Sequence, residues 1–497
     1  MPFPRAFGPT GAIRRPARPG GSSLRLPASR SPAWVLAETA TTTVFSLLSM
    51  LAIGRVIGPE AAGTGMIAVA AFALLDIAGS TLFPDSLVQR RVLTPGHVAS
   101  AVKVAVLVGC GTAGLLAALA PLLAGWSGVA LVAPLCLALA PLLPLSAFAG
   151  AASGPVLRES RFAVLAARVL VGQPLALAVG LGMAAGGWGA WAMVGNQAAA
   201  TLTAFLVLLL FGRLPLRARI SRAALADLWP VALPQVSAIF VMMGRYRLFL
   251  LALGLIASEA VLAVSHLAFR MLDAAVMVVA HTTGRLALPR LCGLQSDRDA
   301  QAEAFGDLAQ LQALLGMPLA AGIALTAPDL VIVLLGPAWA GAGQAAQIAG
   351  CAALLGFLHG EPFSLFVARG RARWNLIINT VALVLPLAAL LLVRPTTPEG
   401  AALAWAAQSL ALPPIVTWLV LREVRRPLPW LLARIAPAAV ATAAMVAVVL
   451  GLQRALALGP AGELAVSVLA GAASYAAVAL LLLRGRTPRA LRRAALA

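Results

Sequence analysis

Apolar runs of about 20 residues recur along this chain from Trp34 to Leu483, and short segments rich in Gly, Pro and Arg separate them. A helix of that length rises about 30 Å, the thickness of the hydrocarbon core of a bilayer. The chain is 61% hydrophobic and 11% charged, and that charged share is about half that of a soluble domain. The sequence therefore predicts an all-α, polytopic membrane protein.

Breaks at Gly, Pro and Arg clusters divide these runs into about fourteen predicted transmembrane helices. No soluble domain fits between them. Their approximate bounds are 33–54, 61–82, 98–124, 128–150, 163–185, 188–211, 229–254, 258–283, 307–335, 343–367, 374–393, 399–421, 432–453 and 463–483.

Charge alternates between successive loops, which supports this count and orients the chain. The net charge of +20 comes from arginines gathered on one predicted side, whereas the other side holds only Arg55, Arg394 and Arg454. The positive-inside rule makes the basic side cytoplasmic, so the charge indicates topology and not nucleic-acid binding. Residues 1–32 contain no apolar signal core and are predicted to be a disordered basic cytoplasmic tail, as are residues 485–497. The basic loops contain Arg90, Arg158, Arg161, Arg213, Arg217, Arg219, Arg222, Arg285, Arg290, Arg298, Arg369, Arg371, Arg373, Arg422, Arg425 and Arg426.

An internal repeat divides the predicted helices into two lobes. Residues 51–61 resemble residues 251–260, residues 124–128 resemble 337–341, and the basic turn 158–161 resembles 369–373, in the same order. The pattern predicts an N-lobe over 33–211 and a C-lobe over 229–421, each of six helices, followed by two extra helices over 430–484. An even number per lobe places the pseudo-two-fold axis along the membrane normal, a framework suited to alternating access.

Few ionisable residues lie well inside the predicted spans, where each costs roughly 2.5–3.5 kcal/mol at the bilayer centre unless it has a cavity, a partner or a function. Those singled out are Glu38, Asp76, Arg245, Arg247, His266, Arg270, Asp273, His281, His359 and Glu361.

Arg245 and Arg247 form a doubly positive segment in the seventh span. Arg245 lies 16 residues past Trp229, or about 24 Å along an ideal helix, beyond the midplane of the bilayer. Two residues separated by one do not share a helix face. Either the side chains enter a central cavity, where a guanidinium suits phosphate, or they extend to the outer interface.

The other buried candidates keep two interpretations each. Arg270 and Asp273 are one helical turn apart and could neutralise each other or line a cavity. Glu38 and Asp76 are candidate proton or cation sites, although Glu38 is near enough to a helix end to reach water. His359 and Glu361 precede Pro362, where a broken helix could expose main-chain carbonyl groups; alternatively, both side chains serve local packing.

Catalytic and cofactor motifs are missing from the sequence. It contains no P-loop, GxSxG or HExxH motif, and its predicted outer loops are too short for a catalytic domain. The four cysteines lack CxxC spacing and neighbouring metal ligands, so neither a disulfide nor a metal site is expected. We therefore expect no enzyme and no cofactor, and any transport must use an ion gradient, the membrane potential or the substrate gradient.

Several short motifs resemble those of the polysaccharide (Wzx-type) flippases within the multidrug/oligosaccharidyl-lipid/polysaccharide exporter superfamily. They lie in family order over roughly residues 45–340, and the span count is also similar. They comprise Gly54-Arg-Val-Ile-Gly-Pro-Glu-Ala-Ala-Gly63, Ser86-Leu-Val-Gln-Arg90, Leu93-Thr94, Leu267-Ala-Phe-Arg-Met-Leu-Asp273, Leu288-Pro-Arg-Leu291 and Gly336-Pro-Ala-Trp339.

The resemblance implies a bacterial inner-membrane flippase for undecaprenyl-pyrophosphate-linked oligosaccharide, with a cationic cavity between the lobes and the last two helices guiding the lipid tail. Its expected partners are that lipid-linked oligosaccharide, membrane lipids, and a polysaccharide polymerase or other glycan-assembly proteins. By position, Arg245 or Arg247 matches the arginine region that the family places in the seventh helix, and Arg55 matches its arginine at the end of the first. The sequence departs from the family at Leu248–Leu251, which is wholly apolar where members often have an acidic stretch, so coupling through a carboxylate there is in doubt.

Two alternatives remain within the superfamily, a lipid II flippase and a cation-coupled multidrug exporter. Lipid II carries the same pyrophosphate and is therefore hard to separate from the first hypothesis. An exporter of cationic drugs would favour a carboxylate-rich cavity, against which Arg245 and Arg247 argue. A membrane polymerase or glycosyltransferase would need a sizeable outer loop, which the sequence lacks.

Overall fold

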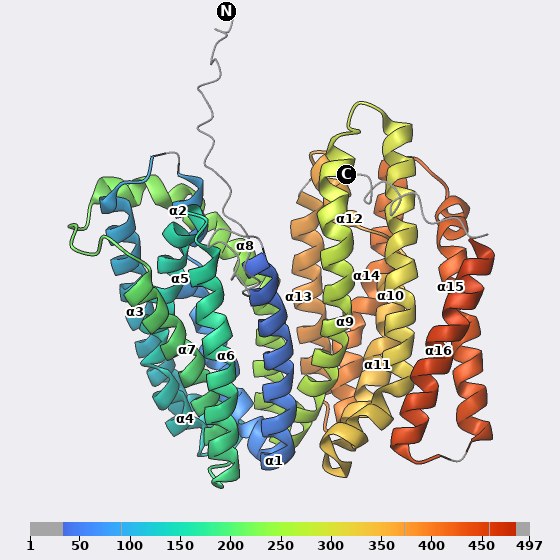
Figure 1. The fold of residues 1–497 in the computed structure, drawn as a ribbon, viewed down its shortest axis with the longest axis horizontal. Helices are drawn as coiled ribbons and strands as arrows, with labels where there is room; N and C mark the ends of the chain where they lie inside the picture. Colours follow the sequence, from blue (N-terminus) through green and yellow to red (C-terminus); the bar gives the residue numbers. More distant parts are fainter. Residues whose placement is uncertain (1–32, 91, 372, 457, 484–497) are drawn as a thin grey trace, which may run out of the picture.

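A computed structural model describes residues 33–90, 92–371, 373–456 and 458–483 of the chain. Every regular element in these ranges is a helix, which confirms the all-α prediction. Figure 1 shows two groups of helices side by side, α3–α7 and α9–α16, with α1 and α8 between them. The two predicted basic tails, 1–32 and 485–497, lie outside the described residues.

The first half of the chain forms seven helices. The predicted spans 128–150, 163–185 and 188–211 correspond to α4 with α5, to α6 and to α7, each within a few residues. The bounds are α1 Ala33–Ser80, α2 Pro84–Gln89, α3 Pro95–Ser127, α4 Val132–Leu139, α5 Leu142–Arg158, α6 Phe162–Ala185 and α7 Trp191–Phe211.

A bend inside α1 separates the first two predicted spans. Gly58 has φ 77° and ψ 170° there, a conformation that only glycine adopts without strain, and Pro59 follows it. The two segments before and after Gly58 correspond to the predicted helices 33–54 and 61–82, and the non-helical Gly58 lies at the predicted outer turn between them.

The second half of the chain repeats the succession of long helices and adds a pair at its end. The predicted span 343–367 is divided in two, because α11 ends at Gly356 and α12 begins at Pro362, so the broken helix is the one of the two interpretations that the structure shows. The bounds are α8 Arg222–Ile256, α9 Glu259–Cys292, α10 Arg298–Leu335, the 3-10 helix η1 Pro337–Trp339, α11 Ala340–Gly356, α12 Pro362–Ala368, α13 Arg373–Val393, α14 Pro398–Val424, α15 Leu428–Ala455 and α16 Pro460–Leu482.

Eleven segments of the described chain are long and apolar enough to cross a membrane. The first of them, Ala37–Gln89, takes in both of the first two predicted spans. The helices α9 and α11 lie at the predicted spans 258–283 and 343–367 but are not among the eleven. The polytopic architecture is therefore confirmed, and the count of fourteen stays a prediction, as does the division into lobes.

The predicted basic loops gather at the ends of neighbouring helices. Arg158 donates a hydrogen bond of 2.9 Å to the main-chain oxygen of Val88, and Arg161 donates one of 2.6 Å to that of Phe211. Figure 1 shows α2 and α12, from the two halves of the chain, at the same end of the molecule. Loops that the charge pattern assigns to one side thus lie at one end, although the membrane orientation stays a prediction.

The largest buried cluster lies where the two groups of helices meet. It includes Phe72 of α1, Phe249 of α8 and Phe269 of α9, together with Trp339. The helix α8 packs against α1 and α3 as well as against α13. A residue of α8 can therefore face either group, depending on its position around the helix.

Candidate functional site

The two arginines of α8 point toward different helices. The guanidinium of Arg245 lies 5.8 Å from the ring centre of Trp405 in α14, and Arg245 interacts electrostatically with Asp273 of α9. Its Nε is shielded from solvent and has no hydrogen-bond partner among the described residues. Arg245 thus faces the C-terminal group of helices.

Arg247, two residues further on, faces α1 instead. Its Nη1 donates a hydrogen bond to the main-chain oxygen of Ala73, and it interacts electrostatically with Asp76, one turn along α1. Asp76 in turn accepts a hydrogen bond of 3.2 Å from Ser80. The divergence of the two arginines agrees with the prediction that residues separated by one do not share a helix face.

Arg270 and Asp273 of α9 complete this group of charges. Arg270 donates a hydrogen bond of 2.6 Å to Ser46 in the first segment of α1. Asp273 interacts electrostatically with both Arg270 and Arg245. We call Asp76, Arg245, Arg247, Arg270 and Asp273 the α1–α8–α9 cluster; its three arginines and two aspartates leave one net positive charge.

Aromatic side chains close off one side of the α1–α8–α9 cluster. Trp405 lies 5.0 Å from Phe249, 5.5 Å from Tyr246 and 5.6 Å from Phe269, measured between ring centres. The hydroxyl of Tyr246 is 2.8 Å from Nδ1 of His266, so His266 has a partner within the protein. The surroundings of Arg245 on this side are therefore aromatic and largely buried.

Residues 52–344 match the family described as polysaccharide biosynthesis protein, over more than half of the chain. The chain belongs to this family. The matched region contains α8, α9 and the second segment of α1, and hence every residue of the α1–α8–α9 cluster.

Solved structures of transporters share the fold of this polysaccharide biosynthesis family member. A structure of lipid II flippase MurJ in an inward closed conformation aligns with a TM-score of 0.76 at 10% identity, covering 92% of this chain and 99% of the other. An inward-facing multidrug resistance MATE family transporter of the MOP superfamily aligns with a TM-score of 0.60 at 13% identity, covering 78% and 98%. No curated protein matches the sequence. The chain thus shares its fold with these two transporters, and neither the family nor the fold specifies the substrate.

Arg55 of this family member lies apart from the α1–α8–α9 cluster. It is exposed, and its Nη1 donates a hydrogen bond of 2.6 Å to the main-chain oxygen of Leu334 near the end of α10. The structure thus places the predicted substrate arginine in a contact between α1 and α10, outside the cluster.

His359 and Glu361 lie in the break between α11 and α12, also outside the cluster. The ring of His359 contacts the main-chain oxygen of Gly360 at 3.2 Å, and Glu361 accepts a hydrogen bond of 3.5 Å from Ser364. Both contacts are local, so the structure brings neither residue to Arg245 or Arg247.

Glu38 has a partner that sequence reasoning missed. Arg168 of α6 donates a hydrogen bond of 3.2 Å to its carboxylate, and about a quarter of each side chain is exposed. Arg168 lies inside the predicted span 163–185, so counting every charge within that span would have found it. Trp405 gave no comparable signal, because a tryptophan inside an apolar span is common in a helix core.

The described residues contain no group of three or more His, Cys, Asp or Glu side chains placed to hold a metal ion. The two aspartates of the α1–α8–α9 cluster face arginines of α8 and α9. The chemistry available to this cluster is therefore the binding and release of an anion by arginines whose present partners are carboxylates and main-chain oxygens.

Proposed function

We propose that this protein is a flippase that moves undecaprenyl-pyrophosphate-linked oligosaccharide across the bacterial inner membrane by alternating access, with both termini in the cytoplasm. The observation that carries the proposal is the environment of Arg245. Its guanidinium lies beside Trp405 and has a buried Nε without a hydrogen-bond partner. A diphosphate group offers several charged oxygens to such a planar donor set.

The position of the arginine pair suits a change of partners during transport. Arg247 is bonded to α1, whereas Arg245 interacts with α9 and α14. A pyrophosphate entering between these helices would compete with Asp273 for Arg245 and with the main-chain oxygen of Ala73 for Arg247. Substrate binding would then weaken contacts that hold the two groups of helices together. A ligand shifts a conformational equilibrium only if it binds one conformation more tightly than the other, and this competition for partners would supply that difference.

An apolar pocket beside this region suits the hydrocarbon part of the substrate. It has a volume of about 150 Å³ and lies between α1, α9 and α10. Leu51 and Met271 line it, and Met271 directly follows Arg270 of the α1–α8–α9 cluster. Charged and apolar recognition are thus available close together, as a lipid pyrophosphate requires.

A lipid II flippase is the second candidate. Lipid II carries the same pyrophosphate, and the structural neighbour MurJ is described as a lipid II flippase. Membership of the polysaccharide biosynthesis family favours the oligosaccharide. The net positive charge of the α1–α8–α9 cluster argues against a multidrug exporter of cations.

The test replaces Arg245 in a host that lacks its own copy of the gene. Arg245→Ala should abolish surface-glycan export while membrane insertion remains normal. Arg245→Lys should retain partial export, because lysine keeps the charge but lacks the planar guanidinium fork. Arg247→Ala should reduce export less than Arg245→Ala does. Arg219→Ala, a change of an exposed loop arginine, serves as the matched control and should export normally.

Two outcomes would contradict the proposal. Export at the wild-type level by Arg245→Ala would exclude this arginine from substrate binding. Rescue of cells depleted of their lipid II flippase, without restored surface glycan in the export host, would assign the protein to the second candidate.

A further inference from the structure

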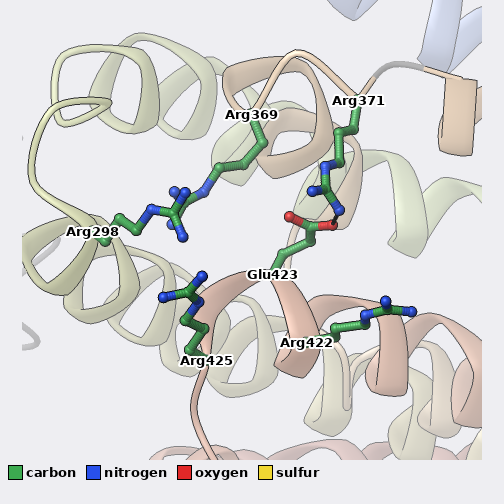
Figure 2. A pocket seen from close by; sticks show the side chains of 6 residues that line it. All are labelled: Arg298, Arg369, Arg371, Arg422, Glu423 and Arg425. Carbon is green, nitrogen blue, oxygen red and sulfur yellow. Dashed lines mark hydrogen bonds and ion pairs between the residues drawn. The ribbon is translucent and has the colours of Figure 1, made fainter.

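A second cationic site lies at the ends of α10, α12 and α14, away from the α1–α8–α9 cluster. It is a pocket of about 370 Å³ lined by charged side chains. Figure 2 shows the guanidinium groups of Arg298, Arg369 and Arg425 directed toward the same space. The full lining is Arg298 at the start of α10, Arg369 and Arg371 around the turn after α12, and Arg422, Glu423 and Arg425 at the end of α14.

The backbone is shaped to bring these arginines together. Gly370 has φ 67°, a left-handed conformation that reverses the chain between Arg369 and Arg371. Arg425, just past the end of α14, has φ 53°, which is uncommon for a residue with a side chain.

Positive charge in this pocket is largely uncompensated. Glu423 is the one acidic side chain among the described residues that line it, and it forms an ion pair with Arg371. Burial, and then the charge of Arg298, lowers the pKa of Arg369, which is also close to Arg371 and Arg425. The Nε and Nη2 of Arg369 are shielded from solvent and have no hydrogen-bond partner among the described residues. Repulsion and unsatisfied donors at one place are costly unless an anion occupies it.

Arginines of α9 and α15, and Arg426 after the end of α14, are, by contrast, paired with carboxylates. Arg290 pairs with Asp307 at 3.0 Å, Arg434 pairs with Asp307 at 2.9 Å, and Arg426 pairs with Asp299 at 3.0 Å. This part of the protein thus supplies carboxylates where charge balance is structural. Among the described residues, Arg371 is the pocket arginine that has such a partner, and the positive charge of the other pocket arginines is available to a ligand.

We propose that this pocket binds a phosphate-bearing anion with two or more negative charges. Guanidinium groups bind phosphate oxygens in pairs, and three arginines from three different segments would surround one such group. The phosphate could belong to an anionic lipid headgroup or to a soluble phosphate compound. This site differs from the one proposed to carry the lipid-linked oligosaccharide, so it does not depend on that function.

Inorganic pyrophosphate is the probe for the test, titrated into full-length protein in nanodiscs of phosphatidylcholine at low ionic strength. Wild-type protein should bind it, and the pocket variant Arg369→Gln/Arg425→Gln should bind at least tenfold more weakly. The matched control Arg217→Gln/Arg219→Gln removes two exposed arginines from the loop between α7 and α8 and should bind within about twofold of wild type, because the net charge is lowered equally.

Thermal unfolding shows whether each variant is folded. Pyrophosphate should raise the melting temperature of the wild type and of the control but not that of the pocket variant. Arg298→Gln provides a milder second variant and should weaken binding by several-fold. The proposal is overturned if wild-type protein does not bind pyrophosphate, or if the pocket variant and the control lose affinity equally.

A lipid arm distinguishes the two sources of phosphate. The titration is repeated in nanodiscs that contain cardiolipin, a lipid whose two phosphates carry two negative charges. If the wild type binds pyrophosphate at least fivefold more weakly in these nanodiscs, while the affinity of the pocket variant does not change, the pocket is assigned to a lipid headgroup. An unchanged wild-type affinity assigns it to a soluble phosphate compound.

Discussion

Arg55 of α1 donates a hydrogen bond of 2.6 Å from its Nη1 to the main-chain oxygen of Leu334 in the last turn of α10. Carbonyl groups at the end of a helix lack partners within the helix, and a cation placed there is favourable. Since α1 and α10 belong to different predicted lobes, a movement that separates the lobes at this end must break the contact. Arg55 therefore links α1 to the last turn of α10 in this structure.

Replacing Arg55 should accordingly loosen this end of the molecule. The side chain is exposed, so we expect Arg55→Ala to weaken the contact between α1 and α10 by about 0.5–1 kcal/mol. The equilibrium between the joined and separated arrangements of these helices should then shift roughly two- to fivefold toward separation. The measurement is the maleimide labelling rate of Leu51→Cys in a cysteine-free protein, because Leu51 lines the apolar pocket between α1 and α10. Labelling should accelerate two- to fivefold.

Arg394→Ala is the matched control for that measurement, since Arg394 is an exposed arginine just past the end of α13. Its labelling rate should equal that of the parent. Equal rates for all three proteins would show that the contact of Arg55 does not hold the two helices together.

The pair formed by Glu38 and Arg168 permits a test of whether Glu38 couples transport to an ion. If the pair is structural, Glu38→Gln and Arg168→Gln should each lower stability, and a double-mutant cycle should give a coupling of about 1 kcal/mol at this part-buried site. Thermal unfolding in detergent measures the cycle, and glycan export is assayed in parallel.

Export decides between the two roles of Glu38. A structural pair predicts that the double variant Glu38→Gln/Arg168→Gln exports glycan about as well as wild type. Loss of export in every protein that lacks Glu38, including the double variant, would instead identify this carboxylate as a coupling group.

Much of the architecture was predictable because it follows from forces that act along the sequence. Hydrophobic runs of bilayer length set the helices, and charge in the loops indicated which ends lie together. The turn at Gly58 was predictable from the Gly-Pro pair, because a glycine adopts the positive φ that ends one helix and a proline suits the first turn of the next.

The site was less predictable because its contacts join residues far apart in the chain. The sequence singled out Arg245 and Arg247 and showed that they face different ways, but it could not name Trp405 or Ala73 as the groups they meet. Arg55 was predicted to bind substrate from its place in a motif, whereas its partner Leu334 is 279 residues away. The pocket around Arg369 escaped notice because loop arginines were interpreted only as topology signals.

Asp307 anchors an ion network that joins α9, α10 and α15. Only a tenth of its side chain is exposed, and it bonds to Arg290 and Arg434. Asp307→Asn would leave both arginines without this charge, and we expect it to lower the free energy of unfolding by about 2 kcal/mol. Thermal or denaturant unfolding of the purified protein measures this loss.

Asp299→Asn is the appropriate comparison, because Asp299 also pairs with an arginine but 89% of its side chain is exposed. Its effect should stay within about 0.5 kcal/mol. A similar loss for both variants would mean that burial does not govern the strength of this network.

Gly63 lies where α1 meets the start of α9, and the helices there are too close for a side chain. A Cβ atom built on Gly63 would lie 1.9 Å from the main-chain oxygen of Glu259. Gly63→Ala must therefore push the two helices apart, and backbone atoms cannot move aside as a flexible side chain can. We expect Ala263→Cys, fully buried in the first turns of α9, to react with maleimide at least about fivefold faster in this background, since a shift of about 1 kcal/mol suffices. Glycan export should fall as well.

Gly114→Ala in α3 is the control, because nothing lies within 4 Å of its Cβ and alanine favours a helix by about 1 kcal/mol. Unchanged labelling and export in Gly63→Ala would show that close contact between α1 and α9 is not needed for transport.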